Sequence, residues 1–95
     1  MTSRQGNGVP GNRALEDTVS RLIATILGKK PGSVKPNDPL FSSQAGFDSI
    51  SLIELVLRIE DTFDLSISDE DLDPDVFRSA KTIAFYLRVR LDQVG

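Results

Sequence analysis

Apolar residues recur at helical spacing in three separate segments of this 95-residue chain, and this pattern constrains the fold more than any other feature. Steps of one, three and four residues place side chains on one face of a helix. Alternation typical of a strand occurs only over the short stretch 65–68. We therefore expect an all-α domain. The first segment contributes Leu15, Val19, Leu22, Ile23, Ile26 and Leu27.

The first helix is expected from about Arg13 to Leu27, with Asn12 as its N-cap and Gly28 as its stop. A long connection follows over residues 29–47, where three prolines and two glycines exclude regular structure. Connections of this length need anchors of their own in a compact domain. We expect Leu40 and Phe41 to be those anchors.

The second helix is expected to begin at Asp48 or Ser49 and to end near Phe63. So much of it is apolar that we place it at the centre of the bundle. Its inward face is predicted to comprise Ile50, Ile53, Val56, Ile59 and Phe63, widened by Leu52, Leu55 and Leu57.

The acidic stretch 69–75 predicts a short helical turn, with Leu72 and Phe77 facing inward. Ser79 can cap a last helix over about residues 80–91. That helix is predicted to bury Ile83, Phe85, Tyr86, Leu87 and Leu91. The expected fold is a four-helix bundle with a short third helix. The chain is expected to divide into a flexible N-terminal tail (1–12), the helical domain (13–91) and a C-terminal tail (92–95).

The chain has no cysteine and no histidine. This excludes the usual zinc ligand sets and Ser-His-Asp nucleophilic machinery, and it leaves Ser49 without a base for hydrolysis. The lack of cysteine fits a reducing compartment. The first twelve residues contain no apolar run, so we expect neither a signal peptide nor a membrane span, and a cytoplasmic protein.

Negative charge is concentrated in residues 48–75, which hold ten carboxylates against the single cation of Arg58. Such a surface argues against nucleic acid and for a partner with a basic docking surface. The later cations at Arg78, Lys81, Arg88 and Arg90 are interpreted as an exposed helix face.

Asp69, Asp71 and Asp73 resemble the opening of an EF-hand calcium loop, but the pattern then fails. Pro74 stands where the loop needs glycine, and Ala80 where it needs a bidentate glutamate. We therefore expect no metal site.

Ser49 stands where the long connection becomes the second helix, within Gly46-Phe47-Asp48-Ser49-Ile50. The first residues of a helix leave backbone N–H groups without partners, and the helix dipole favours an anion there. The position suits attachment of a phosphodiester-linked group. The simpler interpretation is capping, with Asp48 as N-cap or with Ser51 and Glu54 as a capping box.

These residues resemble the modification motif of the acyl and peptidyl carrier proteins. The likeness continues through 52–64, which is similar to the family's recognition helix, through 67–72, and upstream through Asp38-Pro39-Leu40-Phe41. The resemblance implies that Ser49 receives 4′-phosphopantetheine from coenzyme A, through a Mg²⁺-dependent phosphopantetheinyl transferase. Asp48 would be its motif partner. The protein would then be a free-standing carrier of acyl or aminoacyl thioesters, not an enzyme.

The same resemblance implies an acidic docking face made of Glu54, Glu60 and Asp61 around Leu57, although Leu52 and Leu57 could equally be core residues. The implied partners are an acyl- or aminoacyl-loading enzyme and ketosynthase, condensation or other acyl-transfer enzymes with basic surfaces. We expect a monomer.

Two positions depart from the commonest fatty-acid pattern, because Ser51 and Arg58 reduce negative charge beside the arm. We interpret them as a sign of polyketide, nonribosomal-peptide or related specialised metabolism. The alternative from another class is an unmodified acidic helical module that binds a basic partner.

Overall fold

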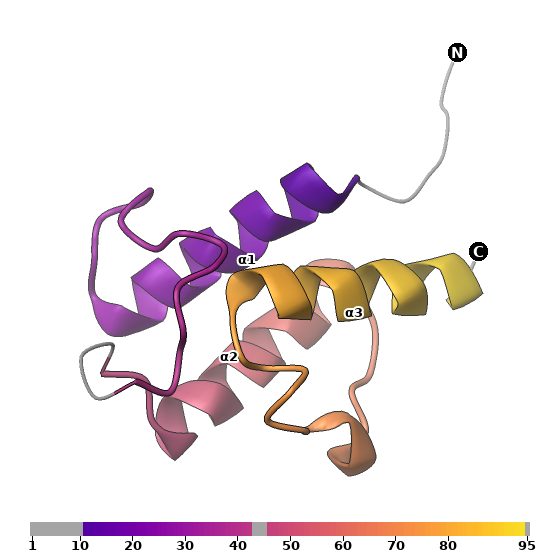
Figure 1. Cartoon of the computed structure of the whole chain (residues 1–95). Coiled ribbons are helices and arrows are strands. Elements are labelled where there is room, and N and C mark those ends of the chain that lie inside the picture. Colours follow the sequence, from indigo (N-terminus) through magenta and orange to yellow (C-terminus); the bar gives the residue numbers. More distant parts are fainter. Residues whose placement is uncertain (1–10, 43–45, 95) are drawn as a thin grey trace.

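The computed structural model describes residues 11–42 and 46–94. Within that part the elements are α1 (Asn12–Leu27), α2 (Ser49–Phe63), the 3₁₀ turn η1 (Asp69–Asp71) and α3 (Ala80–Val94), with no strand (Figure 1). The all-α prediction is therefore confirmed for the described residues. The short third helix of the predicted four-helix bundle is only the three-residue 3₁₀ turn η1.

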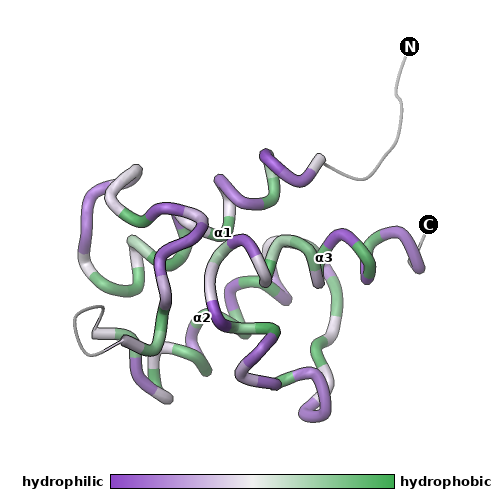
Figure 2. Tube along the Cα trace, in the orientation of Figure 1, coloured by the Kyte–Doolittle hydropathy of each residue, from purple (hydrophilic) through white to green (hydrophobic). Residues whose placement is uncertain are grey.

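The acidic stretch forms only a turn because its side chains compete for the backbone. Asp73 Oδ1 accepts the N–H of Asp75 at 2.7 Å, and such local bonds replace helical ones. Pro74 supplies no N–H, and neighbouring carboxylates repel one another in a helical turn. In Figure 2 this stretch is a polar loop below α3.

Helix α1 packs closely against both α2 and α3, whereas the backbones of α2 and α3 lie farther from each other, although both contribute side chains to the same core. Residues 64–79 therefore connect the two helices and close that side of the molecule (Figure 1). The core takes residues from all three helices and both connections. Its largest fully buried side chains are Phe77, Leu15, Ile23, Leu40, Leu55, Ile59, Ile83, Leu87 and Val19.

The predicted roles of Gly28 and Ser79 at helix ends are confirmed. Gly28 ends α1 in the left-handed conformation, at φ 71°, and its N–H reaches Ala24 O and Thr25 O. Ser79 precedes α3, where its Oγ accepts the Thr82 N–H at 3.3 Å and Thr82 Oγ1 accepts the Ser79 N–H at 3.0 Å. The prediction of Asn12 as the N-cap of α1 is wrong.

Asn12 is the first residue of α1, and Gly11 precedes it as an N-cap that makes no side-chain bond. The Asn12 side chain instead accepts a bond from Arg88 of α3, at 3.2 Å. Helix α3 also continues to Val94, so residues 92–94 are helical and not a tail. An Arg88–Asp92 ion pair at 3.8 Å spans the predicted end. Apart from residues 11 and 12, the predicted N-terminal tail lies outside the described residues.

The long connection is anchored by buried side chains and by backbone bonds to the start of α3. Leu40 is buried as predicted, and its N–H donates to Arg78 O at 2.9 Å. Phe41 is not an anchor, because it is 49% exposed. Val34 and Phe47 take that role, and the Phe47 ring meets Phe41 edge-on with centroids 5.2 Å apart.

The buried face of α2 differs from the predicted one. Leu55 and Ile59 are fully buried, whereas Ile50 and Ile53 face solvent. Two apolar stripes overlap on this helix, and the one that packs on the core comprises Leu52, Leu55, Val56, Ile59 and Phe63.

Two inward predictions near α3 are also wrong. Phe85 is 68% exposed, because Ile83, Ala84 and Leu87 form the face that packs on the core. Leu72 is 37% exposed, whereas Phe77 is buried as predicted.

Candidate functional site

Ser49 is the first residue of α2, and it is exposed. The residue before it, Asp48, is the N-cap and has extended backbone. Asp48 Oδ1 accepts the Ser51 N–H at 2.9 Å and the Ser51 hydroxyl at 3.1 Å. The predicted capping role of Asp48 is therefore confirmed. The alternative capping box is not formed, because Glu54 pairs with Arg58 instead.

The start of α2 is an electropositive environment. Hydrogen bonds from the Ser51 N–H and then from its hydroxyl hold the pKa of Asp48 below its ordinary value. The same unpaired N–H groups and helix dipole favour a further anion at Ser49. The serine itself has no histidine to activate it, because the chain contains none. This end of the helix is suited to carrying a group, not to attacking a substrate.

The loop before Ser49 is held in place by its own residues. Gly46 has a φ of 76°, in the left-handed region that other residues rarely adopt. Phe47 follows and is only 5% exposed, so its buried ring fixes the chain two residues before Ser49. The backbone that carries the Ser49 hydroxyl is therefore held in a defined position at the surface.

The exposed face of α2 begins beside Ser49. Ile50, Ile53 and Leu57 are 75%, 62% and 60% exposed, at positions i, i+3 and i+7 of one helix face. Leu57 is thus a surface residue and not part of the core. Sequence reasoning had placed Ile50 and Ile53 inside, although their shared spacing with Leu57 already marked a second stripe.

The three predicted acidic docking residues lie in different surroundings. Asp61 is exposed. Glu54 is half-buried and bonds Arg58 at 2.8 and 3.0 Å, so its charge is partly neutralised. Glu60 is also half-buried, and its Oε2 accepts the Ile67 N–H at 2.8 Å. One oxygen of the Glu60 carboxylate is therefore engaged in a bond within the domain.

A small apolar cleft lies one helical turn from Ser49. It has a volume of about 210 Å³ and opens between α2 and the segment that follows η1. Leu52, three residues after Ser49, lines it from α2, which explains why this leucine is only half-buried. The other lining residues are Phe41, Leu72, Asp73, Pro74 and Phe77.

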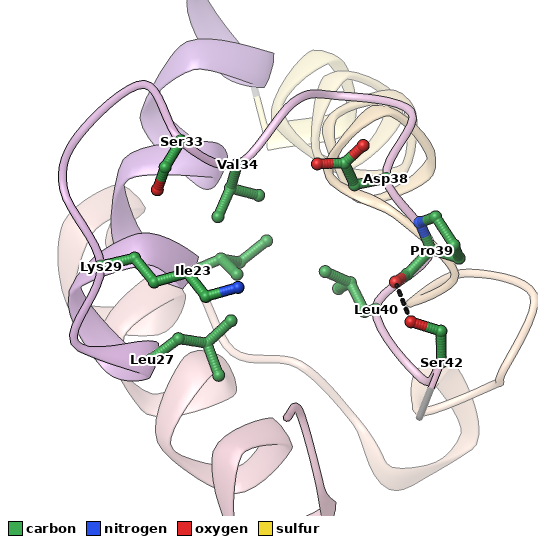
Figure 3. Close-up of a pocket in the computed structure, with 9 residues that line it drawn as sticks. All are labelled: Ile23, Leu27, Lys29, Ser33, Val34, Asp38, Pro39, Leu40 and Ser42. Carbon is green, nitrogen blue, oxygen red and sulfur yellow. Dashed lines mark hydrogen bonds between the residues drawn. The ribbon is translucent and has the colours of Figure 1, made fainter. Parts of the chain in front are cut away.

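A second hollow of about 330 Å³ lies between the end of α1 and the long connection (Figure 3). Ile23 and Leu27 of α1 face Val34 and Leu40 across it. All its lining residues lie between positions 23 and 42, so α2 contributes none of its walls. It is a gap under the anchored connection and not the mouth of the Ser49 site.

Within residues 11–42 and 46–94, no group of three or more acidic side chains is arranged to hold a metal ion. No helix in this part of the chain combines the length and the apolar character that a bilayer crossing needs.

Comparison with known proteins agrees with this arrangement. Residues 17–84, most of the chain, match the family described as "Phosphopantetheine attachment site". Among solved structures, a similar one is BlmI, a type-II acyl carrier protein from Streptomyces verticillus involved in bleomycin biosynthesis. The TM-score is 0.68 at 24% sequence identity, over 84% of this chain and 89% of that one. The chain belongs to the phosphopantetheine attachment family, whose members are carriers for that cofactor and not catalysts.

Proposed function

We propose that Ser49 is the residue that bears 4′-phosphopantetheine, and that the chain carries acyl or aminoacyl groups on it as thioesters. The observation that supports this most is the place of the hydroxyl: exposed, at the first residue of α2, beside the capping carboxylate of Asp48, and within the matched family region. Asp48 is the motif partner that orders this turn. The arm ends in a thiol, so a chain without cysteine can take part in thioester chemistry.

The attachment is a transfer of a phosphoryl group that already carries pantetheine. Ser49 Oγ forms a bond to the phosphorus next to pantetheine in coenzyme A, and the P–O bond to the other phosphate breaks. The leaving group is adenosine 3′,5′-bisphosphate, and the serine proton passes to a base of the separate transferase. The new phosphodiester lies at the positive end of the α2 dipole, which stabilises its charge.

The cleft between α2 and residues 72–77 is proposed to receive the apolar part of the cargo. Leu52 and Phe77 supply apolar surface, and the mouth lies one turn from Ser49. At about 210 Å³ the cleft is below the usual range for drug-sized ligands, which fits a short or medium acyl chain. Because the cleft is shallow, the cargo can leave it for a partner enzyme.

Partner enzymes are proposed to dock on the exposed face of α2. Ile50, Ile53 and Leu57 give an apolar strip, with Glu54 and Asp61 beside it. The matching surface on the transferase, the loading enzyme, and ketosynthase or condensation enzymes would be apolar with basic residues at its rim. Glu60, which the family resemblance places on this face, is proposed to contribute less to docking, because its Oε2 accepts the Ile67 N–H.

The pathway is proposed to be specialised metabolism, of the polyketide, nonribosomal-peptide or a related kind. Support comes from the reduced charge next to the arm, where Ser51 is neutral and Arg58 neutralises Glu54 through two hydrogen bonds. We further propose that the protein acts as a cytoplasmic monomer.

Intact-mass spectrometry tests the attachment. The protein is incubated with coenzyme A, Mg²⁺ and a broad-specificity phosphopantetheinyl transferase, beside Ser49→Ala and the matched control Ser51→Ala. We expect one added phosphopantetheine in the wild type and in Ser51→Ala, and none in Ser49→Ala. A folded wild-type sample without added mass would contradict the proposal and favour an unmodified acidic module with a basic partner.

A further inference from the structure

Two side chains of α3 form a connected polar cluster with the segment after α2. Tyr86 Oη donates to Asp71 Oδ2 at 2.7 Å, and Arg90 Nη1 donates to Tyr86 Oη at 2.6 Å. Arg90 Nη1 also lies 3.4 Å from Asp71 Oδ2, and its Nη2 donates to Ser66 O at 2.7 Å. We call Ser66, Asp71, Tyr86 and Arg90 the α3 clamp.

The clamp is better shielded from solvent than the other ion pairs in the described part of the chain. The Arg90 and Asp71 side chains are 25% and 37% exposed, whereas both partners of every other pair are at least 43% exposed. Shielding strengthens an ion pair and reduces its screening by salt. The Arg90 guanidinium carbon also lies 5.7 Å from the Tyr86 ring centroid. The cluster therefore restrains the segment more firmly than a surface pair would.

The clamp acts directly on one wall of the cleft beside Ser49. Asp71 is followed in the chain by Leu72, which lines that cleft opposite Leu52 of α2. The far end of the wall is fixed by buried Phe77 and by a bond from Thr82 Oγ1 to Val76 O, at 2.8 Å. The clamp fixes the near end.

Helix α3 lines no part of this cleft, and its backbone does not approach that of α2 closely, so the wall that faces α2 belongs to the connection 64–79. On the α2 side the segment is held by the bond from the Ile67 N–H to Glu60. On the α3 side it is held by the clamp. Without the clamp, the hydrogen bonds left to residues 68–74 would be two turn bonds near η1 and those that Asp73 accepts from residues 75–77.

We propose that Tyr86 and Arg90 are positioning residues for the cargo cleft, which hold Asp71 so that Leu72 stays opposite Leu52 and an apolar cargo is retained. A wall that is already ordered loses less conformational freedom when cargo enters, so retention is stronger. The inference rests on the proposed attachment at Ser49.

The test compares two cargoes on the full chain. Octanoyl and acetyl groups are loaded onto Ser49 from their coenzyme A thioesters with a broad-specificity transferase. Hydroxylamine then cleaves each thioester: its nitrogen bonds the acyl carbon and loses a proton, the C–S bond breaks, and the sulfur takes up that proton to become a free thiol. Mass spectrometry follows both rates, and the acetyl-to-octanoyl rate ratio measures protection by the cleft.

The variants are Tyr86→Phe, which keeps the ring but loses both bonds of the phenol, and Asp71→Ala, which breaks the clamp from its exposed side. Arg88→Gln is the matched control, because it removes a cation from α3 outside the clamp. We expect a ratio well above one in the wild type and in Arg88→Gln. It should fall by half or more in each clamp variant, and no further in the double variant.

Amide hydrogen exchange supplies a readout that needs no cargo. Exchange over residues 66–74 should rise at least severalfold in both clamp variants, while that of buried α1 amides stays unchanged. An unchanged rate ratio in both clamp variants, or an equal fall in Arg88→Gln, would overturn the proposal. A wild-type ratio of one on a loaded protein would overturn it too, with the attachment at Ser49 intact. A protein that accepts no arm would overturn both.

Discussion

The Glu60 carboxylate accepts the backbone N–H of Ile67 at 2.8 Å, and this bond ties the end of α2 to the segment that returns toward α3. Both groups are partly shielded, since Ile67 is buried and Glu60 half-buried. The bond directs the Glu60 carboxylate toward the segment that follows α2. The neighbouring carboxylates therefore differ, because Glu60 makes a bond within the domain whereas Asp61 is exposed to solvent.

Replacing Glu60 with alanine should lower the free energy of unfolding by about 1 to 2 kcal/mol, because a buried N–H loses a charged acceptor. Asp61→Ala, at the exposed neighbouring position, should change it by less than about 0.5 kcal/mol. Urea denaturation of both variants measures the difference. Equal losses would mean that the Glu60 bond does not stabilise the fold.

Sequence reasoning located the helices and the start of α2 at Asp48 and Ser49 because both depend on local patterns. Gly28 stops α1 through its own backbone freedom, and Asp48 caps α2 through a bond to a residue three positions on. Such features need no knowledge of the rest of the chain.

The roles that sequence reasoning missed depend on distant partners. Ile50 and Ile53 follow a helical stripe as regular as that of Leu55 and Ile59, and only the position of α1 decides which stripe is covered. Glu60 likewise looks like any surface carboxylate until the chain returns and brings Ile67 to it.

Asp48 should give stability a specific acid dependence. Its folded-state pKa is lowered by the Ser51 bonds, so its contribution is complete above the unfolded-state value of about 3.9. The contribution is then lost as the pH falls through the folded-state pKa. Asp48→Asn keeps an N-cap acceptor without the titration, so the difference in stability between the two proteins should shrink below about pH 4. Urea denaturation across the acid range measures it, and a constant difference would exclude the effect.

Tyr86 should make the free energy of unfolding depend on pH in the alkaline range, where stability is lost as the pH rises and not as it falls. Burial first, and then the bond to Asp71, raise the pKa of Tyr86 above its ordinary value, while Arg90 acts against the rise. The folded state therefore keeps the phenol proton at a pH where the unfolded state has lost it. Stability should fall as the pH rises beyond about 10.

The alkaline prediction is easily measured because Tyr86 is the only tyrosine. Absorbance of the phenolate reports its titration in the folded and urea-unfolded protein without overlap. The folded midpoint should lie above the unfolded one, and Tyr86→Phe should lack the corresponding loss of stability. A folded midpoint at or below the unfolded one would contradict the shielding of this side chain.

Asp64 ends α2 in the left-handed conformation, at φ 53°, and is the only residue other than glycine in the described chain with positive φ. Its side chain makes no hydrogen bond or ion pair with the described residues. Glycine adopts this conformation without the steric cost, so Asp64→Gly should raise the free energy of unfolding by about 0.5 to 1 kcal/mol. Asp61→Gly, inside the same helix, should lower it by roughly 0.5 kcal/mol. Urea denaturation measures both changes in the free energy of unfolding, and a gain at Asp64 with a loss at Asp61 agrees with Asp64 as the C-cap of α2. A loss at both positions would mean that the helix continues past Asp64.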